Sequence, residues 1–195
     1  MRRKGLQYQP PTCFVLGSQG QPEPTAADLL WQVNMALAYG FQGISYYTYW
    51  VWGIEPLAIT YLDSLPTGKH AEVRRINQQA ANLGPTLTRL AATGVYHIAE
   101  SLLSCARRPA GLPLGVQGER PIVLGMYPHE DGAVWAIVAN RDHLRGNEVR
   151  LDVADSVSRL EELRPATGAL RPLTLAGETA ARRLRPAERR LFRLR

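Results

Sequence analysis

The chain has 195 residues, of which 45% are hydrophobic and 21% are charged, which excludes wholesale disorder and predicts a globular protein of one or two domains. No apolar run reaches the roughly 18 residues of a membrane-spanning helix, so we expect no membrane partner. The basic residues 2–4 precede a segment that is not apolar, so we expect no signal peptide at this N-terminus and leave the compartment open.

The formal net charge of +6 lies mainly in the C-terminal half, and above all in its last residues. There, arginines alternate with Leu184, Leu191, Phe192 and Leu194. This alternation is typical of a strand with one solvent-exposed face. Because no nucleic-acid-binding motif accompanies the arginines, we expect a solvated strand face and no nucleic-acid partner.

The first predicted elements are a strand and a helix. Residues 12–19 form a short apolar run followed by glycine and prolines, which is typical of a buried strand and a loop. Thr25 and Asp28 have the spacing of a capping box, with Asp in place of Glu or Gln, and predict a helix start. Gly40 stands where a C-terminal glycine cap is expected.

A second predicted strand, over residues 43–49, ends in aromatic side chains. Tyr47 and Tyr49 share one face and Tyr46 and Thr48 the other, and the pattern leaves open which pair faces inward. A long connection follows, and apolar residues at helical spacing predict a helix from about His70 that breaks or kinks at residues 84–85. The order is therefore strand, helix, strand, helix.

Beyond residue 104 the pattern changes. Residues 105–120 are rich in Pro, Gly and Arg and predict a linker. The hydrophobic period then falls to about two, which predicts a small antiparallel β-sandwich over residues 121–195, after a first domain over residues 1–104. The predicted strands are 121–127, 133–140, 148–153, 158–163, 170–175, 181–185 and 190–194.

Motifs for metals and phosphates are missing from the sequence. The four histidines and two cysteines lack metal-ligand spacing, and there is no glycine-rich phosphate loop and no nucleophile elbow. We therefore expect no metal and no cofactor.

The run LLWQVNMALAYGFQGISYYTYW resembles the end of the (β/α)8 barrel in bacterial glycoside hydrolases of the clan-A, β-galactosidase-like kind, where a helix ends in ALAYGA and a strand in YFTYW. KHAEVRRINQQAANLGPTLTRL resembles their last barrel helix, and AVWAIVANRD and LRPAERRLFRL resemble parts of their C-terminal β-sandwich. The resemblance extends from about Thr12 to Arg195. It implies an α/β plus all-β fold, namely the last two βα units of a TIM-type barrel (strands seven and eight with their helices) followed by a small antiparallel β-sandwich.

The resemblance also implies which catalytic groups this chain can hold. The family's acid/base carboxylate follows strand four, so it would lie with strands one to six upstream of Met1. Its nucleophile is expected at the end of strand seven, where Ser18 and Gln19 stand, and Glu23 follows a few residues later. Because a retaining glycosidase needs two carboxyl groups about 5–5.5 Å apart, we expect the chain alone to be inactive.

Each candidate site residue has two interpretations. Glu23 is either a catalytic carboxylate or a solvated loop residue between two prolines. Gln19 either hydrogen-bonds a sugar hydroxyl or is an ordinary turn residue, and Trp50 is either a stacking platform for a sugar ring or a packing residue of the core or rim. The further candidates for substrate contact are Tyr47, Tyr49 and Trp52.

The resulting functional prediction is a fragment of a glycoside hydrolase that acts on O-glycosidic bonds, with carbohydrate as its ligand. Two alternatives stay open. The chain could be a non-catalytic carbohydrate-binding or accessory protein, or it could be a subunit that pairs with a separate N-terminal barrel half.

Overall fold

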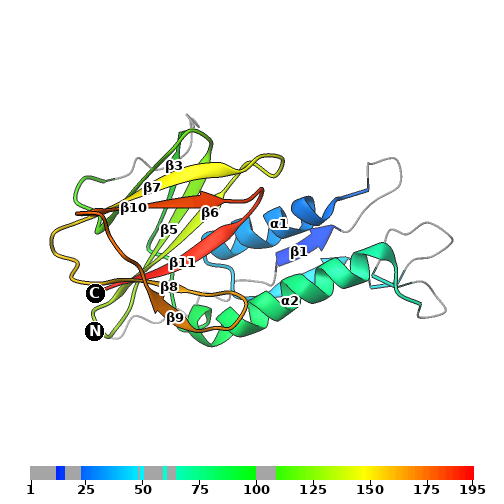
Figure 1. Ribbon diagram of the computed structural model, residues 1–195. Helices are drawn as coiled ribbons and strands as arrows, with labels where there is room; N and C mark the ends of the chain where they lie inside the picture. Colours follow the sequence, from blue (N-terminus) through cyan, green and yellow to red (C-terminus); the bar gives the residue numbers. More distant parts are fainter. Residues whose placement is uncertain (1–11, 16–22, 48, 51–58, 61–64, 100–108) are drawn as a thin grey trace.

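The computed structural model describes residues 12–15, 23–47, 49–50, 59–60, 65–99 and 109–195. Figure 1 shows two helices and a short parallel sheet beside a larger body of antiparallel strands. In chain order the elements are β1 (Thr12–Val15), α1 (Ala26–Ala38), β2 (Ile44–Tyr47), α2 (Gly68–Leu87), β3 (Gly94–Ile98), β4 (Leu114–Gly118), β5 (Ile122–Pro128), β6 (Val134–Asn140), β7 (Asn147–Val153), β8 (Leu160–Leu163), β9 (Leu170–Pro172), β10 (Thr179–Leu184) and β11 (Arg189–Leu194).

The first two strands pair in parallel, with Thr12 opposite Ile44 and Val15 opposite Tyr47. α1 connects them, so this part of the chain is a βαβ unit, as parallel pairing of nearby strands requires. The pairing confirms that the two predicted strands are neighbours. Residues 16–19 of the predicted strand lie outside the described residues.

Local signals determine both ends of α1. The hydroxyl of Thr25 accepts a hydrogen bond from the Asp28 backbone N–H, and the Asp28 carboxylate accepts one from the Thr25 N–H, so the predicted capping box is confirmed. At the other end, Phe41 N–H donates to the Ala36 carbonyl and Gly40 has a φ of 89°. This glycine-centred ending is the one that the sequence predicts.

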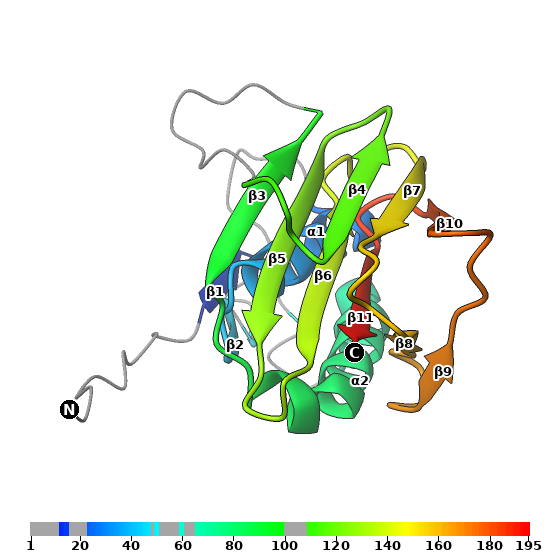
Figure 2. The ribbon, with the colours of Figure 1, turned by 90° about the vertical axis from the view of Figure 1, so that its left-hand side faces the viewer.

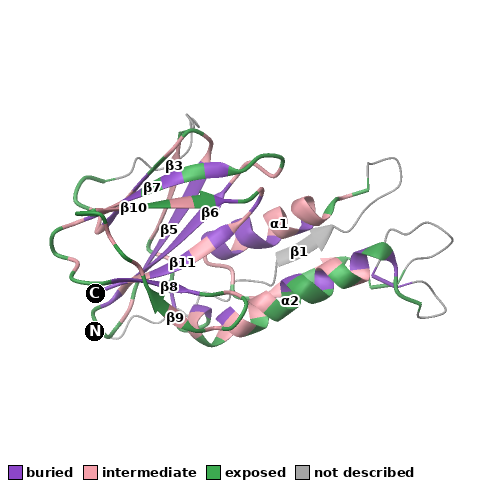
Figure 3. Ribbon diagram, in the orientation of Figure 1, coloured by how far each residue is buried: buried purple, intermediate pink, exposed green. Residues whose placement is uncertain are grey.

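α2 begins at the N-cap Thr67 and runs through Pro85 to Leu87. Of the break or kink expected at residues 84–85, the break is wrong, because Pro85 lies in the last turn, where its missing N–H removes a single hydrogen bond, and the kink stays a prediction. Figure 3 shows buried and exposed positions alternating along the helix. In the described part of the chain, no helix combines the length and apolar character needed to cross a membrane.

The antiparallel strands form two sheets. One has the order β3-β5-β6-β11-β8-β9 and the other has the order β10-β7-β4. Figure 2, seen from the sandwich side, shows both helices behind the larger sheet. The larger sheet therefore has the smaller sheet on one face and the helices on the other, which gives three layers.

This layering explains why β5 and β6 are buried at almost every position. On β5, Val123 and Tyr127 belong to the core shared with the helices, whereas Leu124 and Met126 belong to the core between the two sheets. A strand buried on both faces has a nearly continuous apolar sequence instead of an alternating one. The helices are thus packed on the sandwich through a common hydrophobic core.

The contact between α1 and the sheet is close. The Tyr127 hydroxyl donates to the carbonyl oxygens of Leu37 and Ala38 at 2.7 and 2.8 Å. Gly125, two residues earlier on the same face, leaves the space that the end of α1 occupies, since a Cβ there would lie 2.3 Å from the Ala38 oxygen. The Trp31 indole N–H also donates to the Arg141 carbonyl at 2.9 Å.

Two strands were not expected from the sequence. β3 lies within the segment assigned to the first domain but pairs with β5 in the larger sheet. β4 lies within the predicted linker and pairs with β7, with Leu114 opposite Val153. The seven strands that the period-two pattern predicts are all present, so the antiparallel sandwich is larger than residues 121–195.

The expectation of a solvated face holds for Arg183, Arg185 and Arg195, which are exposed, but not for Arg189 and Arg193. Arg189 is only 4% exposed. It lies opposite Ala139, which belongs to the core shared with the helices. Arg193 lies over the Trp135 ring at 5.8 Å and pairs with Glu161. Leu191, between them on the same face, belongs to the core shared with the helices, so this face of β11 is turned towards the helices and away from solvent.

Candidate functional site

Large aromatic side chains are exposed at the end of β2. Tyr47, Tyr49 and Trp50 are 65%, 55% and 54% exposed. The rings of Tyr49 and Trp50 meet edge to face, with centroids 5.9 Å apart and an interplanar angle of 68°. More than half of the Trp50 surface is therefore available to a ligand, which argues against the interpretation of Trp50 as a core residue.

The alternation along β2 separates Tyr46 from Tyr47. Tyr46 packs against the core shared with the helices, and its hydroxyl donates to the Asn77 Oδ1 atom of α2 at 2.8 Å. Burial raises the pKa of this phenol to about 12, so it stays protonated at neutral pH. Tyr46 thus faces the helices, and Tyr47 points to the opposite side of the sheet.

The backbone beyond β2 is held by Thr60 and Thr67. The Thr60 N–H donates to the Tyr49 carbonyl at 2.9 Å, and Trp50 forms a parallel bridge with Thr60. Thr67, the N-cap of α2, donates through both its N–H and its hydroxyl to the Ile59 carbonyl at 3.0 Å. The aromatic pair is therefore connected to the start of α2.

A groove of about 430 Å³ lies between Tyr49 and α2. Its helical wall presents positions 70, 73, 74, 77, 78 and 81, which share one face of α2 because they are three or four residues apart. The polar members, His70, Arg74, Asn77 and Gln78, offer several hydrogen-bonding groups beside an aromatic ring. The remaining lining residues are Ile59, Val73 and Ala81.

Glu23 lies near the start of α2. Its side chain is 53% exposed, and its carboxylate pairs with the ammonium group of Lys69, whose side chain is 4% exposed. Glu23 is therefore an exposed loop residue that also supplies the counter-ion of a buried cation. The catalytic role of Glu23 stays a prediction.

The other two candidates, Gln19 and Trp52, lie outside the described residues. Sequence reasoning missed the α2 wall of the groove. The polar residues His70, Arg74, Asn77 and Gln78 follow helical spacing, and this pattern was the available signal. Among the described residues, no three or more His, Cys, Asp or Glu side chains form a group that could hold a metal ion.

Comparison with known proteins gives a likeness of fold. No protein-family model and no curated protein matches the chain. Among solved structures, it is similar to a candidate alpha-galactosidase from Bacteroides fragilis NCTC 9343, with a TM-score of 0.50 and 10% identity over 94% of this chain and 32% of that one. A candidate alpha-galactosidase/melibiase from the same organism gives a TM-score of 0.48 and 12% identity, over 90% of this chain and 30% of that one.

The catalytic domain of GH30 xylanase C from Talaromyces cellulolyticus gives a TM-score of 0.35 and 13% identity, over 95% of this chain and 38% of that one. The chain thus spans about a third of the length of these structures. At these identities the likeness concerns the fold alone. This chain has a fold similar to about a third of the first candidate alpha-galactosidase structure.

Proposed function

We propose that the chain is part of a glycoside hydrolase of the clan-A, β-galactosidase-like kind, and that the end of β2 contacts its carbohydrate. In this proposal β1 and β2 are strands seven and eight of a TIM-type barrel. The observation that carries the proposal is the exposed pair Tyr49–Trp50 beside the amide-lined groove on α2.

The chemistry of the groove suits a sugar. A pyranose has apolar C–H faces, which stack on aromatic rings, and hydroxyl edges, which need donors and acceptors. Tyr49 in the groove and Trp50 beside it offer the rings, and Asn77, Gln78 and Arg74 offer amide and guanidinium groups. Galactosides are the first ligands to test, because a fold neighbour carries the name alpha-galactosidase.

We further propose that the isolated chain does not hydrolyse glycosides. Retaining hydrolysis needs a nucleophile and a proton donor about 5–5.5 Å apart. In this chain Glu23 is engaged by Lys69, and the chain spans about a third of its fold neighbours. Turnover of aryl galactosides by the purified chain, lost on Glu23→Gln, would show that this view is wrong.

The binding proposal is tested with Trp50→Ala. We expect titration calorimetry against galactose, melibiose and a panel of neutral oligosaccharides to show about tenfold weaker binding, since stacking on an indole face contributes on the order of 1–2 kcal/mol. The melting temperature should change little, because Trp50 is 54% exposed. Leu144→Ala is the matched control, since Leu144 is 75% exposed and lies between β6 and β7, not at the end of β2.

Two results would contradict the binding proposal. One is the absence of binding to any sugar of the panel by the unaltered chain. The other is equal affinity of the Trp50→Ala, Leu144→Ala and unaltered proteins.

A second candidate, a subunit that pairs with a separate barrel half, is favoured by the short parallel sheet. In the described part of the chain, β1 and β2 pair only with each other, although parallel sheets are normally buried and extended on both sides. Hydrogen exchange tests this candidate. Amides of residues 44–47 should exchange fast in the isolated chain and slowly once a partner supplies further strands, and slow exchange in the isolated monomer would contradict it.

A further inference from the structure

A second cavity, of about 340 Å³, lies between the two helices and the turn that connects β10 to β11. We call it the helix–sandwich cavity. α1 contributes Leu30 and Asn34 to its wall, α2 contributes Arg75, and the turn and β11 contribute Arg185, Glu188 and Arg189. Its volume is at the lower end of the range for small-molecule sites, about 300–1,000 Å³.

Arg189 is the unusual member of this wall. It is 4% exposed, and its Nε atom is buried without an acceptor. Across the described residues, no carboxylate pairs with its guanidinium group. Burial lowers the pKa of Arg189 to about 10, so the side chain is still a cation at neutral pH. A buried cation without a counter-ion is costly, and anions that reach it gain a strong, charge-assisted contact.

The neighbouring acid does not neutralise Arg189. One carboxylate oxygen of Glu188 lies 3.2 Å from Arg190, and the other accepts a hydrogen bond from the Arg185 backbone N–H at 2.7 Å. Arg75 already pairs with Glu72 at 3.0 Å. The cavity thus has an excess of positive charge, of which Arg189 is the buried part.

A second buried atom in the wall also lacks a partner. The amide nitrogen of Asn34 donates to the Ala187 carbonyl at 2.7 Å, which orients the side chain, but its Oδ1 atom is buried without a donor. Buried polar atoms are normally hydrogen-bonded. Arg189 and Asn34 both line the cavity, and their unpartnered atoms are closed to solvent, so a ligand reaches these atoms when the two side chains shift towards it.

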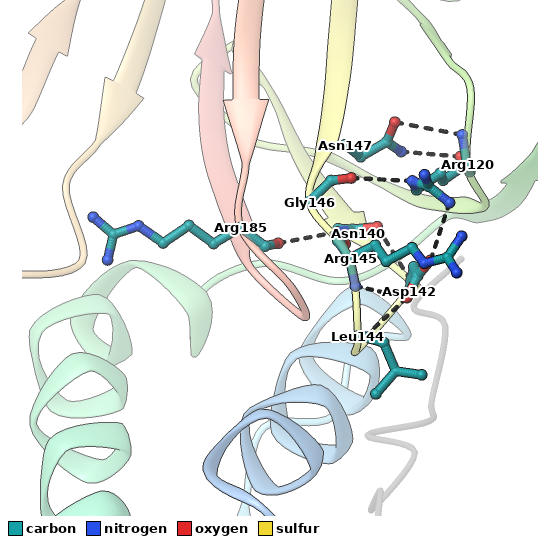
Figure 4. A network of polar contacts seen from close by, with 8 residues as sticks. All are labelled: Arg120, Asn140, Asp142, Leu144, Arg145, Gly146, Asn147 and Arg185. Atoms are coloured by element: carbon teal, nitrogen blue, oxygen red, sulfur yellow. Dashed lines mark hydrogen bonds and ion pairs between the residues drawn. The ribbon is translucent and has the colours of Figure 1, made fainter.

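The turn that carries these groups is fixed by a polar cluster around Asn140 and Asp142 (Figure 4). Asn140 donates to the carbonyls of Arg145 and Arg185 at 2.7 and 3.0 Å, and the Ala187 N–H donates to the Asp142 carbonyl at 3.0 Å. Figure 4 shows the Arg185 side chain extending away from this cluster. The backbone of the turn is therefore fixed before any ligand arrives.

We propose that the helix–sandwich cavity binds a small hydroxycarboxylate of the sugar-acid class, with its carboxylate on Arg189 and a hydroxyl donating to Asn34 Oδ1. Apolar wall residues such as Leu30 would contact the C–H face of the ligand. The proposal does not rest on the proposed function, because none of the residues that line the groove beside Tyr49 lines this cavity.

The test compares D-galacturonate with D-galactose by titration calorimetry on the full chain. The two sugars differ only at C6, where galacturonate has a carboxylate and galactose a hydroxymethyl group. The unaltered chain should bind galacturonate, and Arg189→Met should weaken this binding ~30-fold or more, as loss of a buried charge partner does. Arg171→Met makes the same change at an exposed arginine of β9 and should leave binding unchanged. Trp50→Ala should also leave it unchanged, which separates this site from the groove. Propionate and sulfate, each lacking a hydroxyl, should bind more weakly.

The melting temperatures of the variants show whether a loss of binding reflects a loss of folding. Because Arg189 carries an uncompensated buried charge, Arg189→Met should melt no lower than the unaltered chain in the absence of ligand. If Arg189→Met does not fold, Arg189→Lys, which keeps the charge and displaces it, should weaken galacturonate binding about tenfold.

Four results would overturn the proposal. These are no saturable galacturonate binding by the unaltered chain, equal losses in Arg189→Met and Arg171→Met, loss of binding in Trp50→Ala, and a lower melting temperature of Arg189→Met with unchanged affinity.

Discussion

Replacing Gly125 with alanine tests whether α1 and the sandwich form one cooperative unit. A Cβ at this position would lie 2.3 Å from the Ala38 carbonyl oxygen and 2.8 Å from the Tyr127 hydroxyl. Both partners are parts of the rigid contact between β5 and the end of α1. To restore ordinary van der Waals distances, the end of α1 must retreat by about 1 Å.

That retreat breaks more than a packing contact. The Tyr127 hydroxyl bonds to the Leu37 and Ala38 carbonyls at 2.7 and 2.8 Å would stretch beyond hydrogen-bonding distance. Overpacking a core typically costs about 1–3 kcal/mol, and an unsatisfied buried polar group costs about 1–3 kcal/mol more. We therefore expect Gly125→Ala to lower the free energy of unfolding by roughly 2–5 kcal/mol.

Urea denaturation followed by circular dichroism measures this loss. Gly68→Ala is the matched control, because a Cβ at this first residue of α2 meets nothing within 4 Å. It should be neutral or stabilise by up to about 1 kcal/mol. A loss below about 1 kcal/mol for Gly125→Ala, or equal midpoints for the two variants, would refute the close contact between α1 and β5.

Three further outcomes are expected. Tyr127→Phe should cost about 1–2 kcal/mol in the same assay, because the Ala38 carbonyl loses the hydroxyl and the Leu37 carbonyl keeps only the Gly40 N–H, and an unchanged midpoint would contradict this. Phe192→Ala should cost about 3–5 kcal/mol, since Phe192 is 1% exposed in the core between the sheets, and a loss below 1 kcal/mol would contradict it. The Ala133 N–H, His129 and Arg195 lower the pKa of Asp131 to about 2, so its contribution to stability persists above pH 3.8 and is lost as pH falls towards 2; a ¹³C titration midpoint near 4 would be inconsistent.

Much of the local structure follows from short stretches of sequence. The Thr25–Asp28 capping box and Gly40 determine where α1 begins and ends, and both signals act within a few residues. The sandwich strands from β5 to β11 follow from the period-two alternation and the turn residues between them. The aromatic end of β2 is likewise visible in the sequence, although its exposure is not.

Tertiary contacts determined what local patterns did not predict. β3 and β4 are strands because β5 and β7 pair with them, and β4 lies in a segment whose Pro and Gly content predicts a linker. Tyr46 faces the helices, where its hydroxyl donates a hydrogen bond to Asn77. The alternation along β2 alone does not decide which side of the sheet Tyr46 faces.

Arg189 shows the difference most clearly. The alternation of residues places Arg189 correctly on one face of β11. That face is turned towards the helices, of which α1 lies more than 150 residues earlier in the chain. The Asn34 side chain of α1 donates a hydrogen bond to the Ala187 carbonyl, just before β11. Periodicity reports which side chains share a face, whereas burial depends on what packs against that face. The sequence therefore determined the strand and its two faces. Only the packing of the helices against one face buried Arg189 and placed it in the wall of a cavity.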